Sequence, residues 1–394
     1  KLIMMRKNLL KGGALLAMVV LLFTGCGEAK KAYEQGMEFA NEGKYEKSLP
    51  YFEEAIKQDA DQAEYYIGYG MALNRLNRYT EAENTLKKVA QHADKNNSKE
   101  DNKQIYYGMA IAEYGLGEYD STIKYCDKAA KIEYFDDMNC DIWYTKLSAY
   151  WQQGKWEEAK KTGEKIIKEN ERYMEAYMAL AEVENNLGNT EDAAKVYEKA
   201  IEVNKKYYDA YFKLYDQYLS IGQESDAEKV LDQLLVLKPS SAENMLVIGR
   251  AYLCKQEYDQ AKKFLQMAYD GNSKESLYYL GKAAVAENAY DDAIESFQKY
   301  IKENKNSLNV DVYYQLALVY MKQDKYEDAQ SMLTKGISYG STNSAQALKK
   351  TQVILLEKQN HYKEAKKLAK EYITCYPSDT GMEKELAFIQ TRIK

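Results

Sequence analysis

The chain is poor in the residues that break helices. Its 394 residues include only 3 prolines and 21 glycines. An all-β sandwich or barrel needs frequent turns, and turns draw heavily on these two residue types. Apolar residues make up 45% of the chain and charged residues 29%. This composition predicts a folded protein that is built from helices.

Residues and motifs that carry catalysis or bind metals are also scarce. The two histidines, His92 and His361, lie far apart in the sequence, and we expect both to be solvated. The five cysteines are Cys26, Cys126, Cys140, Cys254 and Cys375. No two of them are spaced as Cys-x-x-Cys, so there is no zinc pattern, and we expect the last four to be buried thiols. No Gly-x-x-x-x-Gly-Lys-Ser/Thr phosphate loop occurs. The sequence therefore predicts no metal, no cofactor and no enzymatic activity.

The charge balance argues against nucleic acid as a partner. The formal net charge is -6. Removal of an N-terminal segment that carries Lys1, Arg6, Lys7 and Lys11 would lower it to -10. Binding to phosphate backbones requires a basic surface. Arginine, whose guanidinium grips phosphate or carboxylate with two hydrogen bonds, occurs only six times.

The first 26 residues have the layout of a secretory signal. Residues 4–11 form a short positive segment, residues 14–23 are an unbroken apolar run, and Gly25 and Cys26 follow. The run is too short to span a bilayer, which needs about 20 residues. A positive end, an apolar stretch and small residues before a cleavage site predict a signal peptide over residues 1–25.

The Gly25-Cys26 pair resembles a lipobox, the sequence at which bacterial lipoproteins are acylated and cleaved. Phe23 stands where that family prefers leucine. The resemblance implies that Cys26 is lipidated and that a short tether, residues 26–31, links it to the body at the extracytoplasmic face of the cell membrane. Two acyl chains suffice for stable anchoring. The alternatives are a secretory signal with an accidental cysteine, and an uncleaved anchor.

A repeat occupies most of the remaining chain. The pattern Gly-x-Tyr-x-x-Ala, with substitutions, recurs about ten times. In its centre the small residues are 34 apart, and so are the larger residues upstream of them. The small residues are Ala159, Ala193, Ala227 and Ala261, and the larger ones are Trp143, Tyr177, Tyr211 and Met245. A fixed period of this length is typical of a solenoid.

Each repeat reads as two amphipathic helices joined by a short turn. Apolar residues recur at spacings of three and four, as in Tyr177, Leu180 and Ala181. The glycine before the tyrosine can adopt the left-handed conformation that ends the first helix. One such pair cannot bury its own apolar stripe, so it must pack against its neighbours.

The period and the pattern resemble the tetratricopeptide repeat (TPR). The resemblance implies an all-α fold, a right-handed α-solenoid of about ten helix pairs over residues 32–377. Residues 378–394, with Met382, Leu386, Ile389 and Ile393 on one face, are expected to form a capping helix.

In this family the first helix of each pair lines a concave groove, and its fifth repeat position points into that groove. The resemblance therefore implies a ligand-binding groove that contains aromatic residues. They are Tyr33, Tyr107, Tyr144, Phe212, Tyr278 and Tyr314. Rigid aromatic side chains are typical of contact hot spots. The alternative is that a tyrosine-rich composition fills these positions for packing between repeats. Tyr114, Trp151, Arg250 and Lys282 are expected nearby.

Two functions fit these features. One is a scaffold that binds a protein or peptide partner at the cell envelope. The alternative is a receptor that stacks a carbohydrate or another nutrient ligand on its aromatic groove. Some family members grip a C-terminal carboxylate with lysine and asparagine at the fifth and ninth positions. That pair is missing here, which favours an extended peptide over apolar pockets. A fold alone does not select a function.

Overall fold

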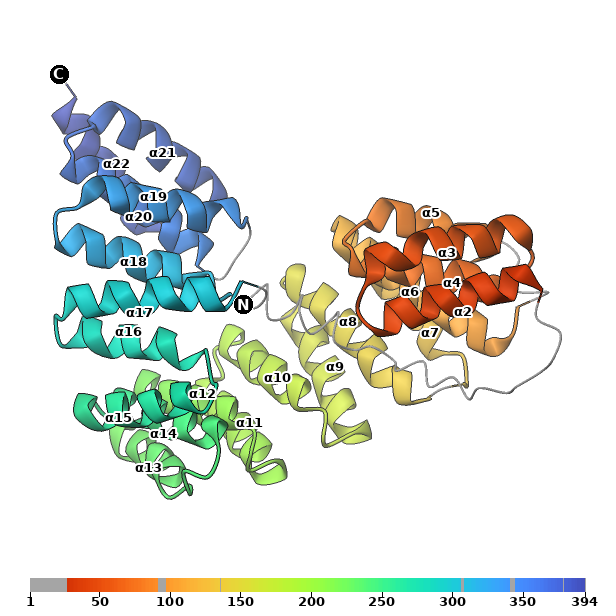
Figure 1. Ribbon diagram of the computed structural model, residues 1–394, viewed down its shortest axis with the longest axis horizontal. Coiled ribbons are helices and arrows are strands. Elements are labelled where there is room, and N and C mark those ends of the chain that lie inside the picture. Colours follow the sequence, from red (N-terminus) through yellow and green to blue (C-terminus); the bar gives the residue numbers. More distant parts are fainter. Residues whose placement is uncertain are drawn as a thin grey trace. The chain divides into compact units, whose positions relative to one another are not determined.

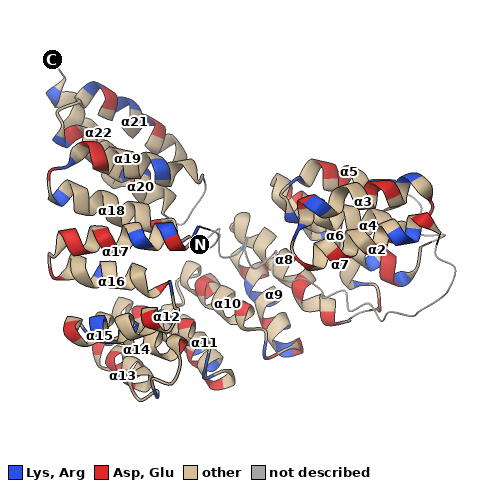
Figure 2. Cartoon of the chain, in the orientation of Figure 1, with Lys and Arg blue, Asp and Glu red and all other residues tan. Residues whose placement is uncertain are grey.

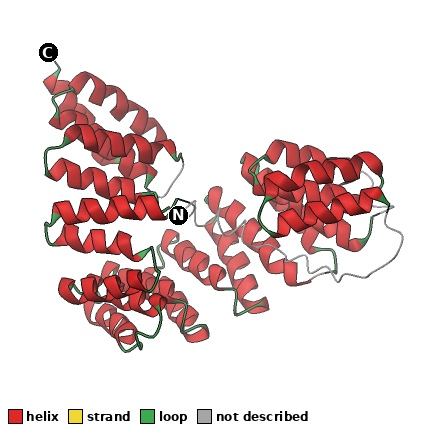
Figure 3. Cartoon of the chain, in the orientation of Figure 1, coloured by secondary structure: helices red, strands yellow, loops and turns green. Residues whose placement is uncertain are grey.

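The computed structural model describes most of the chain after residue 26. The described ranges are 27–90, 97–134, 136–305, 308–340, 344–377 and 379–393. Within them the chain forms α-helices, short turns and one 3₁₀ turn, η1 (Asp136–Met138), as Figure 3 shows. The all-α prediction is confirmed. Every helix in these ranges is too short or too polar to span a lipid bilayer.

The helices follow one another in antiparallel pairs and divide into two bodies, residues 27–222 and residues 223–394 (Figure 1). The first body contains α2 (Glu28–Asn41), α3 (Tyr45–Gln58), α4 (Ala63–Arg75), α5 (Tyr79–Ala90), α6 (Lys99–Leu116), α7 (Tyr119–Ala130), α8 (Asn139–Gln152), α9 (Trp156–Glu169), α10 (Met174–Asn186), α11 (Thr190–Val203) and α12 (Tyr208–Ser220). The boundary at Gly222 falls inside the sixth repeat, between its two helices.

The second body continues the same series of pairs. It contains α13 (Glu224–Leu235), α14 (Ala242–Cys254), α15 (Tyr258–Asp270), α16 (Ser276–Ala286), α17 (Tyr290–Glu303), α18 (Asp311–Lys322), α19 (Tyr326–Ser338), α20 (Ala345–Lys358), α21 (Tyr362–Cys375) and α22 (Thr380–Arg392). The helices from α2 to α21 make ten pairs along the sequence, as predicted.

Both ends of the array differ in detail from a plain repeat. The first helix begins at Glu28, so residues 28–31, expected to be tether, are helical. An acidic side chain in the first turn favours this start, because the helix dipole is positive there. At the other end α22 packs on α21 and buries Met382 and Ile389. It therefore covers the last pair, as expected of a cap.

A residue in the left-handed conformation ends the first helix of every pair. The expected glycine fills five of the ten positions, and a polar residue takes its place in the other five. The residues are Gly43, Asn77, Gly117, Gly154, Gly188, Gly222, Gln256, Asn288, Asp324 and Asn360. After Gly188, the N–H of Asn189 donates to the carbonyl of Glu184 at 2.8 Å; after Gln256, Glu257 donates to Tyr252 at 2.9 Å. The turn is the same one, a Schellman-type helix end.

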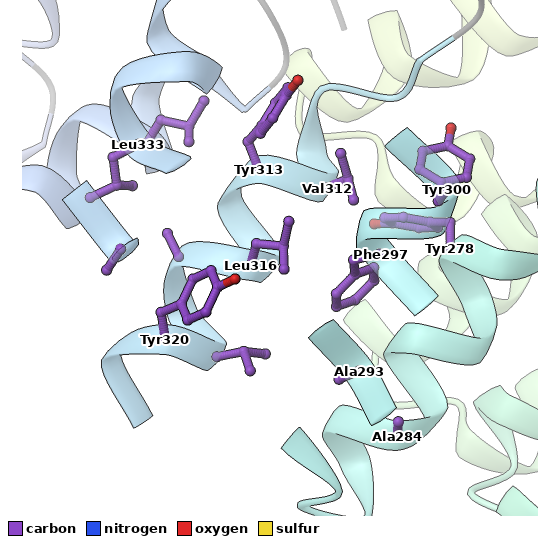
Figure 4. Close-up of a cluster of buried hydrophobic side chains, with 14 of the residues drawn as sticks. Tyr278, Ala284, Ala293, Phe297, Tyr300, Val312, Tyr313, Leu316, Tyr320 and Leu333 are labelled. Carbon is purple, nitrogen blue, oxygen red and sulfur yellow. The ribbon is translucent and has the colours of Figure 1, made fainter. Parts of the chain in front are cut away.

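Buried side chains form a series of hydrophobic clusters along each body. In the second body, Phe297 of α17 is fully buried and packs with Tyr278 of α16 and Leu316 of α18. Figure 4 shows these side chains projecting toward one another from successive helices. Gly281 lies against Phe297 so closely that a Cβ would collide with the ring. The core therefore requires both a large ring and a residue with no side chain.

Contacts between repeats make the first helices the inner side of each body. In the first body α2 touches α4, α4 touches α6 and α6 touches α8; in the second, α14, α16, α18 and α20 touch in the same way. No two successive second helices make comparable contact in the described part of the chain. A stack whose first helices lie closer together curves toward them. The first helices therefore line the concave face of each body.

Candidate functional site

The structure places the six predicted aromatic residues on first helices, but mostly below the surface. The exposed fractions of Tyr33, Tyr107, Tyr144 and Tyr278 are 5%, 2%, 4% and 6%. Phe212 and Tyr314 are half-buried. Four of the six therefore offer little ring surface to a ligand, and packing between repeats accounts for them. Ligand contact at these positions stays a prediction.

Three of the buried tyrosines, Tyr33, Tyr107 and Tyr278, lie near an acidic residue of the following repeat, which stands three positions before the fifth position of that repeat. The hydroxyl of Tyr278 donates to Asp311, which belongs to the following repeat. Burial, followed by the charge of Asp141, raises the pKa of Tyr107, and burial followed by Glu64 does the same for Tyr33. Tyr173 donates to Asp141 Oδ1 at 2.7 Å. A carboxylate of the next repeat therefore accepts a hydrogen bond from Tyr278, and carboxylates at the equivalent position lie close enough to Tyr33 and Tyr107 to raise their pKa values.

On the concave face of the first body, α8 and α10 carry acidic residues and a few apolar ones. Between its buried positions α10 leaves Glu175 and Met178 half-buried, and α8 leaves Trp151 half-buried. The Trp151 ring meets the Trp156 ring edge-on, at 5.1 Å between centroids and 84° between planes. Burial raises the pKa of Asp141 above its ordinary value. No lysine or arginine occupies the fifth, ninth, twelfth or thirteenth positions of α8 and α10.

The concave face of the second body carries a different pattern, an apolar strip. Its members are half-buried and project from three neighbouring first helices, α16, α18 and α20. They are Val285, Tyr314, Leu318, Met321 and Ile354. The three on α18 are spaced i, i+4 and i+7, which puts them on one side of the helix. Val285 and Met321 occupy the same repeat position, and so do Leu318 and Ile354.

Lysines accompany this apolar strip. Lys282 lies on α16 at the position that Leu318 holds on α18, and Lys322 follows Met321. Both are exposed, and the Lys282 Nζ lies 5.8 Å from the centroid of the Tyr278 ring. Within the described ranges no carboxylate lies within 4.0 Å of either ammonium group, whereas the Lys350 Nζ pairs with Asp379 at 2.8 Å. The strip thus carries two cations that are not neutralised by ion pairs.

The two bodies also differ in total charge. Residues 27–222 contain 37 acidic and 27 basic residues, and residues 223–394 contain 24 of each. Figure 2 shows both signs interleaved on most helices of both bodies. The excess negative charge that the whole chain carries after residue 26 therefore belongs to the first body.

Arrangements suited to catalysis do not emerge from the described residues. No group of three or more His, Cys, Asp or Glu side chains in these ranges could hold a metal ion. Two depressions, of about 270 and 440 Å³, are lined mainly by polar and charged side chains. His361 is exposed, as expected, and His92 lies outside the described residues. Cys126 and Cys140 are buried, but Cys254 is only half-buried and Cys375 is exposed, so the prediction of a buried thiol was wrong for these two residues.

Sequence reasoning on the fifth position missed most of the apolar strip. Lys282 was expected near the groove, but Val285, Leu318, Met321 and Ile354 were not singled out. The signal was present, because these residues recur at the ninth and twelfth repeat positions. In the second body the fifth-position Tyr278 is buried, while Val285, Leu318, Met321 and Ile354 at the ninth and twelfth positions are only half-buried.

Comparison with known families agrees with this architecture. Models described as tetratricopeptide repeat match residues 33–98, 144–209, 246–307 and 284–353, which together make up more than half of the chain. The chain belongs to the tetratricopeptide repeat family. Proteins of this family bind protein partners and are usually not enzymes.

Solved structures with similar folds are distant in sequence. A tetratricopeptide repeat protein from Parabacteroides merdae is 16% identical, with 62% of this chain and 93% of that chain covered and a TM-score of 0.42. PilW, a type IV pilus biogenesis factor, is 18% identical, with coverages of 57% and 100% and a TM-score of 0.45. Pseudomonas aeruginosa pilF is 14% identical, with coverages of 55% and 95% and a TM-score of 0.44. No curated protein sequence matches the chain.

Proposed function

We propose that the protein is a lipid-anchored scaffold that holds a protein or peptide partner at the extracytoplasmic face of the cell membrane. The support for anchoring comes from sequence: a positive segment, a short apolar run and a Gly25-Cys26 pair. Cys26 lies outside the described residues. The first described helix begins at Glu28, only two positions later. A chain acylated at Cys26 would therefore hold its first repeat close to the lipid headgroups.

The observation that carries the binding function is the surface pattern of the first helices. Half-buried apolar side chains recur at equivalent positions on α16, α18 and α20, where the array itself does not cover them. Surface apolar residues that are grouped rather than scattered mark sites of interaction. The same helices carry no recognisable catalytic constellation. The grouped apolar surface supports a scaffold that binds its partner on the concave face.

Photo-crosslinking in living cells tests the binding function. We would place a photoreactive residue at Trp151 and at Tyr314 on the concave faces, and at Lys161 and Lys302 on second helices as controls. One recurrent protein adduct from the concave sites alone is the expected result. Concave sites as silent as the controls would refute peptide binding there, and would direct attention to glycan binding.

Acylation at Cys26 is tested separately. Cells that express the chain are fed a radiolabelled fatty acid, and the protein is then recovered from membrane and soluble fractions. The wild-type chain should carry label and sediment with membranes, and Cys26→Ser should lose both properties. Label that persists in Cys26→Ser would contradict the anchor.

A further inference from the structure

The apolar strip of the second body, with Lys282 and Lys322, has the chemistry of a selective surface. An apolar surface alone would accept any hydrophobic segment. The two exposed ammonium groups add a preference for the sign of the partner's charge, because they repel a cationic side chain and attract a carboxylate.

The helix dipole favours a cation at the position of Lys322 but not at that of Lys282. Cations are favoured in the last turn of a helix, and Lys322 is the final residue of α18. Lys282, however, lies in the middle of α16, whose last turn contains no basic residue. Its Nζ is held near the Tyr278 ring and pairs with no described carboxylate. The position therefore places a cation on the concave face without an evident role in folding.

The first body supplies an internal comparison. The residues that correspond to Lys282 and Lys322 by repeat position are Ser148 and Gln152 on α8, and Glu182 and Asn186 on α10. None of these is a cation. The combination of an apolar strip with unneutralised lysines is thus absent from α8 and α10 and is not a general property of the repeat.

We propose that the concave face of α16, α18 and α20 binds a partner segment in which apolar side chains are interleaved with aspartate or glutamate. This inference rests on the proposed scaffold function and specifies its partner. Three helices that pack about 9 Å apart span about 20 Å, which is about six residues of an extended chain. The apolar side chains of the segment lie on the strip, and its carboxylates face Lys282 and Lys322.

Synthetic peptides test the charge and the apolar requirement together. The first probe is a fluorescent ten-residue peptide with three Leu-Glu pairs separated by serines. The second replaces each Glu with Lys, and the third replaces each Leu with Ser. All three are amidated at the C-terminus, so that no terminal carboxylate contributes. Binding to the full-length chain is followed by fluorescence anisotropy.

The Leu-Glu probe should bind, and the other two should bind at least about tenfold more weakly. The double variant Lys282→Glu/Lys322→Glu should lower the affinity for the Leu-Glu probe by about tenfold or more and raise that for the Leu-Lys probe. Lys302→Glu/Lys335→Glu, which reverses two exposed lysines on the second helices α17 and α19, is the matched control and should leave both affinities unchanged. Circular dichroism verifies that each variant keeps its helix content.

Two outcomes would overturn the inference. One is equal binding of the Leu-Glu probe to the wild-type chain and to Lys282→Glu/Lys322→Glu. The other is preferential binding of the Leu-Lys probe, or of no probe at all, to the wild-type chain. If no probe binds while Tyr314 still crosslinks one protein in cells, the scaffold function stands and only the acidic-apolar partner is wrong. Silent crosslinking sites would reject the scaffold function itself.

Discussion

The left-handed residue that ends each first helix offers a direct test of what the repeat turn requires. Gln256 occupies this position in the seventh repeat with a φ of 59°, where five other repeats of the array have glycine at the same point. The left-handed conformation costs an L-residue about 1–2 kcal/mol. Glycine avoids that cost but loses about 0.5–1 kcal/mol more in backbone entropy. Gln256→Gly should therefore stabilise the second body by about 0.5–1 kcal/mol.

The reverse substitution can be made in the first body. Gly188 has a φ of 83°, and a Cβ added there would meet no atom within 4 Å. Gly188→Ala should therefore cost about 1 kcal/mol through backbone strain alone, without any collision. Asn288→Gly makes the same change at an equivalent turn of the second body and serves as a control of intermediate effect. Asparagine tolerates the left-handed region better than glutamine, so less strain is relieved there. Its gain should be smaller than that of Gln256→Gly.

Native-state hydrogen exchange is the suitable assay, because a repeat array can open locally and need not unfold in one step. Amides of α14 and α15 should exchange more slowly in Gln256→Gly than in the wild-type chain. Amides of α10 and α11 should exchange faster in Gly188→Ala. Faster exchange around α14 in Gln256→Gly would refute the reasoning, because it would mean that the glutamine side chain contributes more than its backbone strain costs.

Two further predictions concern the second body. Phe297→Ala should cost about 3–5 kcal/mol, because the ring is fully buried between α16 and α18 and its removal leaves a cavity; urea unfolding of the second body measures this loss. Burial, followed by a hydrogen bond with Glu385, raises the pKa of Glu357 to about 8 from an ordinary value of 4.5. The folded chain then holds a proton that the unfolded chain releases, so stability should fall as the pH rises from about 4.5 through 8. Glu357→Gln should remove this loss and raise the Tm at pH 9 by a few degrees relative to Glu383→Gln, with no such gain at pH 5.

The fold was largely predictable because its determinants are local and repeated. The period of 34 residues, the turn glycines and the small residue at each helix crossing are all visible in the sequence. The turn could be predicted even where glycine is missing, since Asn77, Asn288 and Asn360 are residues that tolerate a positive φ. The division into two bodies at Gly222 could not be predicted, because that turn has the same sequence pattern as the others.

The candidate site was less predictable, because a repeat position does not fix exposure. Tyr278 and Tyr314 hold the same position on neighbouring first helices, yet only Tyr314 is half-buried rather than buried. The difference lies in the next repeat: Asp311 accepts a hydrogen bond from Tyr278, whereas the residue that follows Tyr314 at the corresponding position is Ala347. Whether a tyrosine faces a ligand or a neighbour thus depends on a residue about 33 positions away.

This dependence has a consequence for how the array can acquire specificity. Where tyrosine at the fifth position hydrogen-bonds to the next repeat, it stabilises the stack and is lost to recognition. The ninth, twelfth and thirteenth positions then determine what the concave face can bind. In the first body some of them also hydrogen-bond to a neighbouring repeat, as Asn74, Gln152 and Asn185 do. The positions that can change without disturbing the stack are those that form no such bond in the described part of the chain, such as Lys282 and Lys322. On α8 and α10 of the first body these positions include serine, glutamine and glutamate, while α16, α18 and α20 of the second body have lysines beside leucine, methionine and isoleucine. One repeat architecture therefore carries two surfaces of different chemistry, and a partner segment rich in carboxylates should select the second body over the first.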